Sequence, residues 1–387
     1  MSSEYFGRGS GELYGDYIDF INYVFGFDGH NENFFSLLPK LYKPEYKPLE
    51  SSYVALIDGK LRAAVGAFDH EIMVSGTKLS CRGIGNVAVH PNTRSKGYMR
   101  RLMDMALDDM LRDKIDLSVL GGRRQRYNYF SFEKTGSLYE FAINDDNLRH
   151  CFGADRTAYH TVTLTKLNEN DTAMLDNIEK LLRTQRYSSC RPKERLYDIL
   201  CSWSSTPYVV TKAGGFSGYL IYKADTVFEM VLCDKSDFIN TTITLFDQFK
   251  PKKLTVKLPA YEADYISRLY RVCEGYSVGP VANFSVLRFR RVADAFIRLK
   301  ATYETLPDGE LRLLIHGRGG DENIKIFVSG GTCGVIGNDD ATYDLEVGHI
   351  DAMNLLFSPF CPGRERLPVS ARVWFPLPLW LPRADGV

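Results

Sequence analysis

The sequence lacks the features typical of disulfide-rich, zinc-binding and membrane-spanning proteins. Its eight cysteines include no Cys-x-x-Cys pair and no neighbouring histidine cluster, which argues against a zinc site and a disulfide framework. No run approaches the roughly 18 apolar residues that a membrane helix needs, and the first residues form no apolar signal segment. We therefore expect a cytoplasmic protein that binds no metal.

The chain also lacks an excess of charge of either sign. Its 48 lysines and arginines balance 48 aspartates and glutamates, so the formal net charge is zero. A nucleic-acid or anionic-membrane partner usually requires a basic excess, so neither partner is expected. The 387 residues exceed the roughly 250–300 at which a single hydrophobic core usually divides, which predicts two or three domains.

The most informative segment present runs from residue 87 to residue 103 and predicts a strand, a basic turn and an amphipathic helix. The strand consists of Val87, Ala88 and Val89, and the turn into the helix consists of Arg94, Ser95, Lys96, Gly97, Tyr98, Met99 and Arg100. Free N–H groups at a helix N-terminus bind anions, and a glycine allows close approach of the backbone. The turn is expected to hold a pyrophosphate. The alternative is a structural joint with a solvated basic turn.

This segment resembles the acetyl-CoA-binding motif of the GCN5-related N-acetyltransferase (GNAT) superfamily, a strand followed by Arg/Gln-x-x-Gly-x-Gly/Ala and a helix. The Eis-like (enhanced intracellular survival) branch has the form Arg-x-x-Gly-x-x-Arg-x-Leu-Met, which Arg94, Gly97, Arg100, Leu102 and Met103 match. The resemblance implies an acetyl-CoA-dependent N-acetyltransferase that uses acetyl-CoA as a cosubstrate and a small-molecule primary amine as the acceptor, for example an aminoglycoside-like or lysine-like molecule.

The order of expected elements extends the resemblance along the chain. Residues 11–42 predict two helices, Asp58-Gly59 predicts a hairpin, and residues 137–143 predict the closing strand of a first acetyltransferase domain. Residues 157–288 repeat this order more faintly, and the helix after Cys233 begins without an Arg-x-x-Gly turn. We interpret them as a degenerate acetyltransferase-like domain without a cofactor; an unrelated α/β domain is the alternative.

From about Phe289 the pattern changes to a helix, several strands, another helix and an apolar tail. This layout resembles the sterol-carrier-protein-like C-terminal domain of Eis-like proteins. The resemblance therefore implies an α/β (α+β) fold of tandem GNAT-like domains, the second degenerate, plus a sterol-carrier-protein-like domain. The expected limits are residues 1–156, 157–288 and 289–387. We also expect a homo-oligomer.

A second chemical segment, G-G-R-R-Q-R-Y-N-Y-F-S-F-E-K-T-G, covers residues 121–136. The matching Eis-like segment reads Tyr-Gly-Arg-Phe-Gly-Tyr, so the resemblance places Tyr127 on the catalytic tyrosine and Asn128 and Ser131 on the two glycines. A phenol with a pKa near 10 stays protonated at neutral pH until the thiolate of CoA departs. The alternative is that Tyr127 and Tyr129 only line a cleft. The expected cofactor-binding set also includes Gly122 and Arg123. Two roles stay open for the three arginines of this segment: they bind the phosphates of CoA, or they form a solvated basic face. The residues are Arg123, Arg124 and Arg126.

In the same family the C-terminal carboxylate reaches the active site as the general base, which here is the carboxylate of Val387. Moving a proton from an ammonium of pKa near 10.4 to a carboxylate near 3.5 is unfavourable by about 9 kcal/mol unless burial narrows the gap. An alternative role for the Val387 carboxylate is to orient the amine while water takes the proton. Asp69, His70, Glu71 and His90 are competing bases.

We expect direct transfer, with the backbone of residues 87–89 pairing with the pantetheine arm and polarising the thioester, and with Tyr127 protonating the departing sulfur. Two rival functions stay open. A non-catalytic acyl-CoA sensor would need the basic turn but tolerate loss of Tyr127. A lipid carrier would depend on the C-terminal domain.

Overall fold

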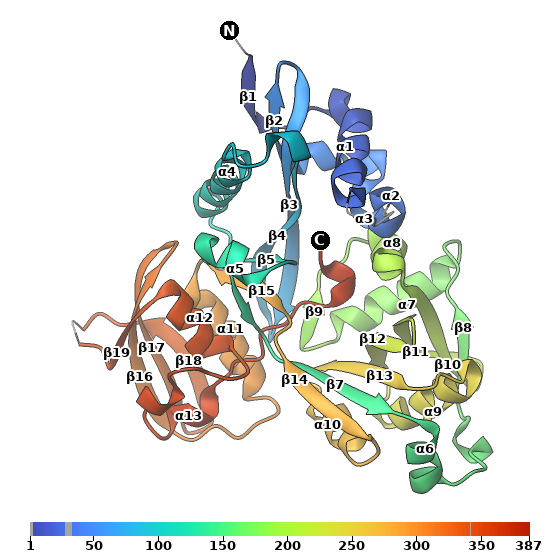
Figure 1. Ribbon diagram of the computed structural model, residues 1–387. Helices are drawn as coiled ribbons and strands as arrows, with labels where there is room; N and C mark the ends of the chain where they lie inside the picture. Colours follow the sequence, from blue (N-terminus) through green and yellow to red (C-terminus); the bar gives the residue numbers. More distant parts are fainter. Residues whose placement is uncertain (1–2, 28–32, 341) are drawn as a thin grey trace.

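The computed structural model describes residues 3–27, 33–340 and 342–387 and arranges them around three β-sheets flanked by helices (Figure 1). The first sheet contains, in spatial order, β1 (Glu4–Arg8), β2 (Ser52–Ile57), β3 (Lys60–Val74), β4 (Thr77–Val89), β5 (Leu117–Leu120), β15 (Ala282–Val286) and β6 (Glu133–Thr135), with β9 (Tyr187–Ser189) paired to β3. Mixed sheets with helical layers confirm the predicted α/β class.

Helices cover both faces of the first sheet. On one face lie α1 (Tyr14–Gly26), α2 (Phe34–Leu37) and α3 (Pro39–Tyr42), which share a core with Ala64, Phe68 and Ala88 of the sheet. On the other face lies α4 (Tyr98–Arg112), whose buried residues are Leu102, Met103, Ala106, Leu107 and Met110. This spacing of three and four residues gives α4 one apolar face and explains why the segment folds as a surface helix.

The second sheet contains, in spatial order, β14 (Gly275–Gly279), β7 (Leu138–Ile143), β13 (Leu254–Pro259), β12 (Thr226–Leu232), β11 (Gly215–Lys223), β10 (Thr206–Lys212) and β8 (Thr163–Lys166). Residues of α9 (Phe238–Phe249) and α10 (Ala263–Tyr270) pack in one core of this sheet, and residues of α7 (Thr172–Arg183) and α8 (Leu196–Cys201) in another. The short helix α6 (Asp145–Phe152) follows β7.

The first two sheets exchange strands, which the sequence pattern does not predict. The strand expected to close the first domain, β7, lies in the second sheet between β14 and β13, where Phe141 and Ile143 are buried. In return, β15 lies between β5 and β6 of the first sheet. The expectation that residues 137–143 close the first domain is therefore wrong. The alternation of apolar and polar residues along a strand indicates which face of the strand is buried. Long-range packing determines which other strand it pairs with.

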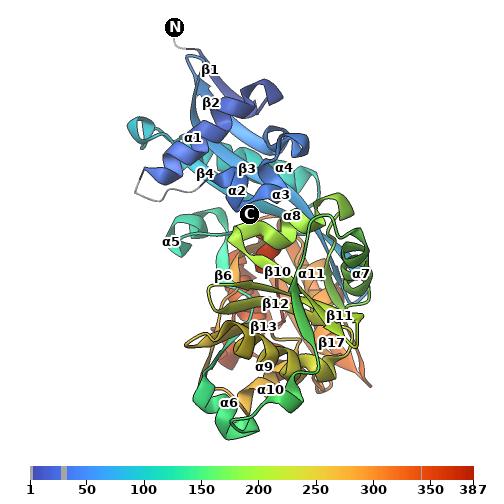
Figure 2. The same cartoon turned by 90° about the vertical axis from the view of Figure 1, so that its right-hand side faces the viewer.

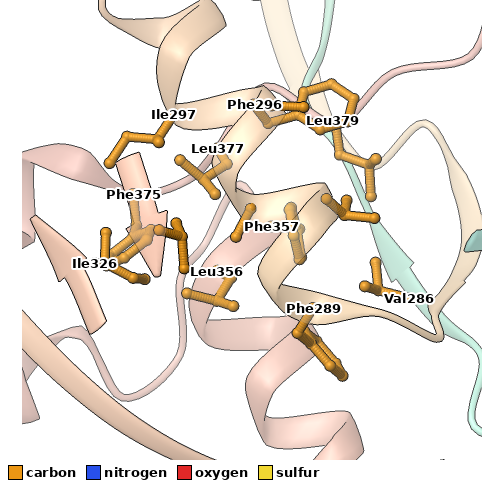
Figure 3. Close-up of a cluster of buried hydrophobic side chains, with 14 of the residues drawn as sticks. Val286, Phe289, Phe296, Ile297, Ile326, Leu356, Phe357, Phe375, Leu377 and Leu379 are labelled. Atoms are coloured by element: carbon orange, nitrogen blue, oxygen red, sulfur yellow. The ribbon is translucent and has the colours of Figure 1, made fainter. Parts of the chain in front are cut away.

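The third sheet contains β18 (Thr332–Gly337), β17 (Gly320–Ser329), β16 (Gly309–Gly317) and β19 (Leu345–Gly348), in that order. It is accompanied by α11 (Phe289–Lys300), α12 (His349–Phe357) and α13 (Ala371–Trp374). Figure 3 shows Phe375, Leu377 and Leu379 of the C-terminal tail beside side chains of α11 and α12. No helix in the described part of the chain is long and apolar enough to cross a membrane.

From this core the tail continues toward the first sheet. The Tyr187 hydroxyl of β9 donates a hydrogen bond to the Trp380 carbonyl at 2.8 Å. The two views show the C-terminus in the middle of the molecule, near α3 and α8 (Figure 1, Figure 2). The last residues therefore lie where parts distant in the sequence meet.

Candidate functional site

Strands β4 and β5 separate in the middle of the first sheet. They pair in parallel from Cys81 with Leu117 to Ile84 with Leu120, and β5 ends there while β4 continues to Val89. An irregularity in the pairing with β3 falls at the same place, where Asn86 has a φ of 47°. Among the described residues no strand pairs with this edge of β4 beyond Ile84, so its backbone groups are available to a ligand.

A groove of about 860 Å³ lies beside this free edge of β4. It is lined by Val24, Phe25, Val87, Val89, Thr93, Arg94, Ser95, Lys96, Gly97, Tyr98, Met99, Arg100, Arg123, Arg126, Tyr129 and Phe130. Ten of the twelve expected cofactor-binding residues are in this set. Ala88 is instead buried with α1–α3, because alternation turns its side chain to the opposite face of β4, and Gly122 lies against the ring of Tyr127.

The groove is basic. Its lining includes five lysines and arginines, and no acidic side chain among the described residues lines it. Gly97 has a φ of 80°, and a Cβ placed there would meet no atom within 4 Å, so the N-terminus of α4 opens into free space. Such an array of N–H groups and cations suits a polyphosphate.

The three arginines of the segment after β5 divide into two roles. Arg123 and Arg126 line the groove. Arg124, in the short helix α5 (Arg124–Tyr127), instead pairs with the buried carboxylate of Glu133, with Nη2 and Oε2 2.6 Å apart. The sequence contained no signal that separates them, because the partner carboxylate lies on β6.

Side chains from three distant segments of the chain hold its last residues. Lys40 of α3 donates to the carbonyls of Ala384 and Gly386, the latter at 2.8 Å, and the Trp203 indole donates to Gly386 at 3.2 Å. Arg191 binds the Asp385 carboxylate at 2.8 and 3.0 Å. These contacts hold residues 384–386 in place beside the first sheet.

The charged side chains at the end of the chain are buried, and Asp385 and Arg191 neutralise each other. Burial by itself raises the pKa of Asp385, but the Arg191 guanidinium reverses the effect and holds that pKa well below its usual range. Arg191 also binds Glu229 at 2.7 and 2.8 Å. Burial lowers the pKa of Lys40 to about 7. Removal of Arg191 would leave carboxylates without their partner, which is strongly destabilising in a protein interior.

Val387 lies directly against β4 where β4 and β5 separate. A Cβ at Gly83 would lie 2.6 Å from Val387 Cγ2, and a Cβ at Gly85 would lie 3.3 Å from the carboxyl carbon. Glycine at both positions is what allows this approach. The pattern Gly-x-Gly on one face of a strand is a sequence signal for such a contact. It was not among the predicted site features, and neither were Lys40, Arg191 and Trp203.

The competing bases lie in two places. Asp69, His70 and Glu71 line a cavity of about 260 Å³ together with Lys40 and Val387. Asp69 is paired with Arg82 at 2.5 Å and Glu71 with Lys78 at 2.7 Å, and burial lowers the pKa of His70. His90 lies elsewhere. Its Nδ1 accepts a hydrogen bond from the Asn92 N–H at 3.2 Å and so caps a turn.

Tyr127 is 5% exposed and packs in the same core as Phe130 and Phe132. Its ring lies against Gly122, two residues beyond the end of β5, and burial raises its pKa while Arg126 opposes that effect. It is outside the set of residues lining the groove, which includes Tyr129 and Phe130. Ser131 adopts a φ of 68°, the left-handed conformation that glycine favours.

No group of three or more His, Cys, Asp or Glu side chains in the described ranges could hold a metal ion. The N-terminus of α9, the counterpart of α4 in the second sheet, is acidic. The Asp234 carboxylate accepts a hydrogen bond from the Ser236 N–H at 2.8 Å, and the buried Asp237 pairs with Lys212 at 2.6 Å. Carboxylates at this helix end disfavour a phosphate.

Residues 10–134 match the family model of the acetyltransferase (GNAT) domain. The structure is similar to that of a GCN5-related N-acetyltransferase from Kribbella flavida, with a TM-score of 0.65, 16% identity and coverage of 100% of this chain and 97% of that chain. It is similar to one from Anabaena variabilis ATCC 29413, with a TM-score of 0.67, 14% identity and coverage of 99% of each chain.

A third similar structure is Eis1 from Mycobacterium abscessus, with a TM-score of 0.60, 13% identity and coverage of 90% of this chain and 88% of that chain. No curated protein sequence matches the chain. At these identities the structural matches establish the fold, and they do so over nearly the full length of each relative.

Proposed function

We propose that the chain is an acyltransferase that transfers the acetyl group of acetyl-CoA to a primary amine. The match of residues 10–134 to the GNAT domain and the fold shared with Eis1 support this proposal. The observation that carries this proposal is the free edge of β4 beside a basic groove without acidic lining among the described residues. A strand edge suits the amide-containing pantetheine arm, and the basic turn suits the pyrophosphate.

Each part of the site has a proposed role. The backbone of residues 87–89 pairs with the pantetheine arm like an added strand, and the N–H groups from Ser95 to Arg100 hold the pyrophosphate. Arg123 and Arg126 add charge at the groove. A backbone N–H of β4 polarises the thioester carbonyl.

Acetyl-CoA, when bound, supplies an acetyl thioester: the neutral amine attacks its carbonyl carbon, the carbon–sulfur bond breaks, and the sulfur leaves as a thiolate. Tyr127 is the proposed donor of the proton to that sulfur, because its ring lies beside Gly122 near the end of β5. The amine nitrogen loses a proton to the Val387 carboxylate or to water. The products are an N-acetylated amine and free CoA, with no covalent enzyme intermediate.

Extending the chain beyond Val387 by one alanine should reduce kcat at least tenfold, because the carboxylate then leaves its place against Gly83 and Gly85. Acetyl-CoA affinity should stay unchanged, since the groove does not include the tail. Steady-state release of free thiol measures kcat, and calorimetry measures the affinity for acetyl-CoA. The same alanine added at the N-terminus is the control. An undiminished kcat would leave Asp69, His70, Glu71 or water as the base.

Calorimetric titration should saturate at one acetyl-CoA per chain. The acidic cap of α9, formed by Asp234 and Asp237, disfavours the phosphate that the turn before α4 favours. A stoichiometry of two would contradict the interpretation of the middle domain as degenerate.

The rival functions predict different results in one assay, the release of free thiol from acetyl-CoA with a panel of amines. Amine-dependent release supports transfer, whereas tight acetyl-CoA binding without release supports a sensor. A lipid carrier would show neither, and its activity would survive changes in the basic turn. Light scattering tests the proposed homo-oligomer.

A further inference from the structure

A second cavity beside Val387, of about 280 Å³, differs in chemistry from the groove. Its walls include Leu120, Trp203, Phe228 and Trp380, and Val387 lies on its surface. Leu120 is the last residue of β5 and Gly121 follows it, at the point where β4 and β5 separate. The cavity therefore begins at the separation of the two strands and continues between the tail and the second sheet.

The charged side chains in the described lining of this cavity are all positive. Lys257 and Arg383 line it, and no acidic side chain in the described ranges does so. Lys257 already has a partner, because its Nζ lies 2.5 Å from the Glu140 carboxylate. The terminal carboxylate of Val387 is thus the one anionic group that the described lining offers to an amine.

Arg383 is the unusual group of the cavity. Its guanidinium carbon lies 4.7 Å from the ring centre of Phe228 and 5.4 Å from that of Trp203. The carboxylates of Glu140, Glu229 and Asp385 pair with other cations, and no ion pair within 4 Å among the described residues includes Arg383. Arg383 is exposed to solvent, and partial burial of its guanidinium against these rings lowers the pKa of Arg383. An anionic ligand group would pair with this solvent-exposed cation, because the aromatic faces stabilise it only partly.

We propose that this cavity binds the acceptor, and that the acceptor is a monoamine with an aromatic or similarly apolar body and an anionic group at its far end. The amine would lie at Val387, the body between Trp203 and Trp380, and the anionic group at Arg383. This inference rests on the proposed acetyl transfer, in which the acceptor nitrogen gains the acetyl group and loses one proton. A polycation would meet the unpaired positive charge of Arg383, so it is disfavoured.

Binding of three probe amines to the full-length protein tests this assignment without catalysis. The probes are 4-(2-aminoethyl)benzoate, phenethylamine and spermidine, and the signal is the fluorescence of Trp203 and Trp380. We expect 4-(2-aminoethyl)benzoate to bind at least tenfold more tightly than phenethylamine, because a hydrogen bond to a charged group discriminates by about 10-fold to 100-fold. Saturable binding of spermidine that is tighter than both would overturn the proposal.

The variant Arg383→Gln should remove most of the preference for 4-(2-aminoethyl)benzoate over phenethylamine, measured as the ratio of the two Kd values. Arg383→Lys keeps the charge and should retain part of it. The matched control is Arg366→Gln, which removes an exposed cation outside this cavity. A preference that persists in Arg383→Gln, with the protein folded by circular dichroism, contradicts the assignment.

Thiol release with the same probes separates this inference from the proposed function. Release that is fastest with 4-(2-aminoethyl)benzoate supports both. Release that prefers spermidine contradicts the cavity assignment and leaves acetyl transfer standing. Saturable binding of 4-(2-aminoethyl)benzoate without thiol release contradicts acetyl transfer to the acceptor class assigned here.

Discussion

Gly97→Glu should abolish measurable acetyl-CoA binding while the protein stays folded. The side chain would project from a backbone of φ 80° into the open space at the N-terminus of α4. There it would place a carboxylate where the pyrophosphate is proposed to bind, so volume and like charge both oppose the ligand. Calorimetry measures the loss, and thermal unfolding checks the fold.

The matched control for this variant is Gly76→Glu. Gly76 has a φ of 81° and equally open surroundings, but it lies in the turn between β3 and β4, away from the groove. It therefore carries the same backbone strain and the same added charge. Unchanged acetyl-CoA affinity in folded Gly97→Glu would mean that the turn is a structural joint.

Tyr127→Phe should lower kcat by about 10²-fold to 10⁴-fold, the range ascribed to general acid–base catalysis, with little change in acetyl-CoA affinity. Phenylalanine keeps the ring that packs against Gly122 and beside Phe130, so the substitution removes the hydroxyl alone. Stopped assays of thiol release and calorimetry measure the two quantities.

Tyr265→Phe is the control, because it removes the hydroxyl of a tyrosine that is 1% exposed and stacks on Phe238 in the second sheet's core. Its kcat should equal that of the unmodified protein. If Tyr127→Phe retains kcat within about threefold, the proton reaches the sulfur from another source. The role of Tyr127 would then be to pack the segment that brings Tyr129 and Phe130 to the groove.

Features that depend on neighbouring residues were predictable from the sequence. The strand, turn and helix from Val87 to Arg112 were predictable because their signals are local: β-prone residues, a glycine with positive φ and apolar residues three and four apart. Resemblance to a known family then indicated the domain order and the expected roles of Tyr127 and Val387, which stay predictions.

Contacts between residues far apart in the sequence became known only from the folded structure. Lys40, Trp203 and Arg191 hold the tail across separations of 346, 183 and 194 residues, and no local pattern marks them as its partners. The exchange of β7 and β15 between sheets has the same origin, since a strand's partner depends on which buried surfaces fit. The cavity at Arg383 exists because two aromatic rings from one part of the chain meet the tail from another, and that meeting is a property of packing rather than of sequence order.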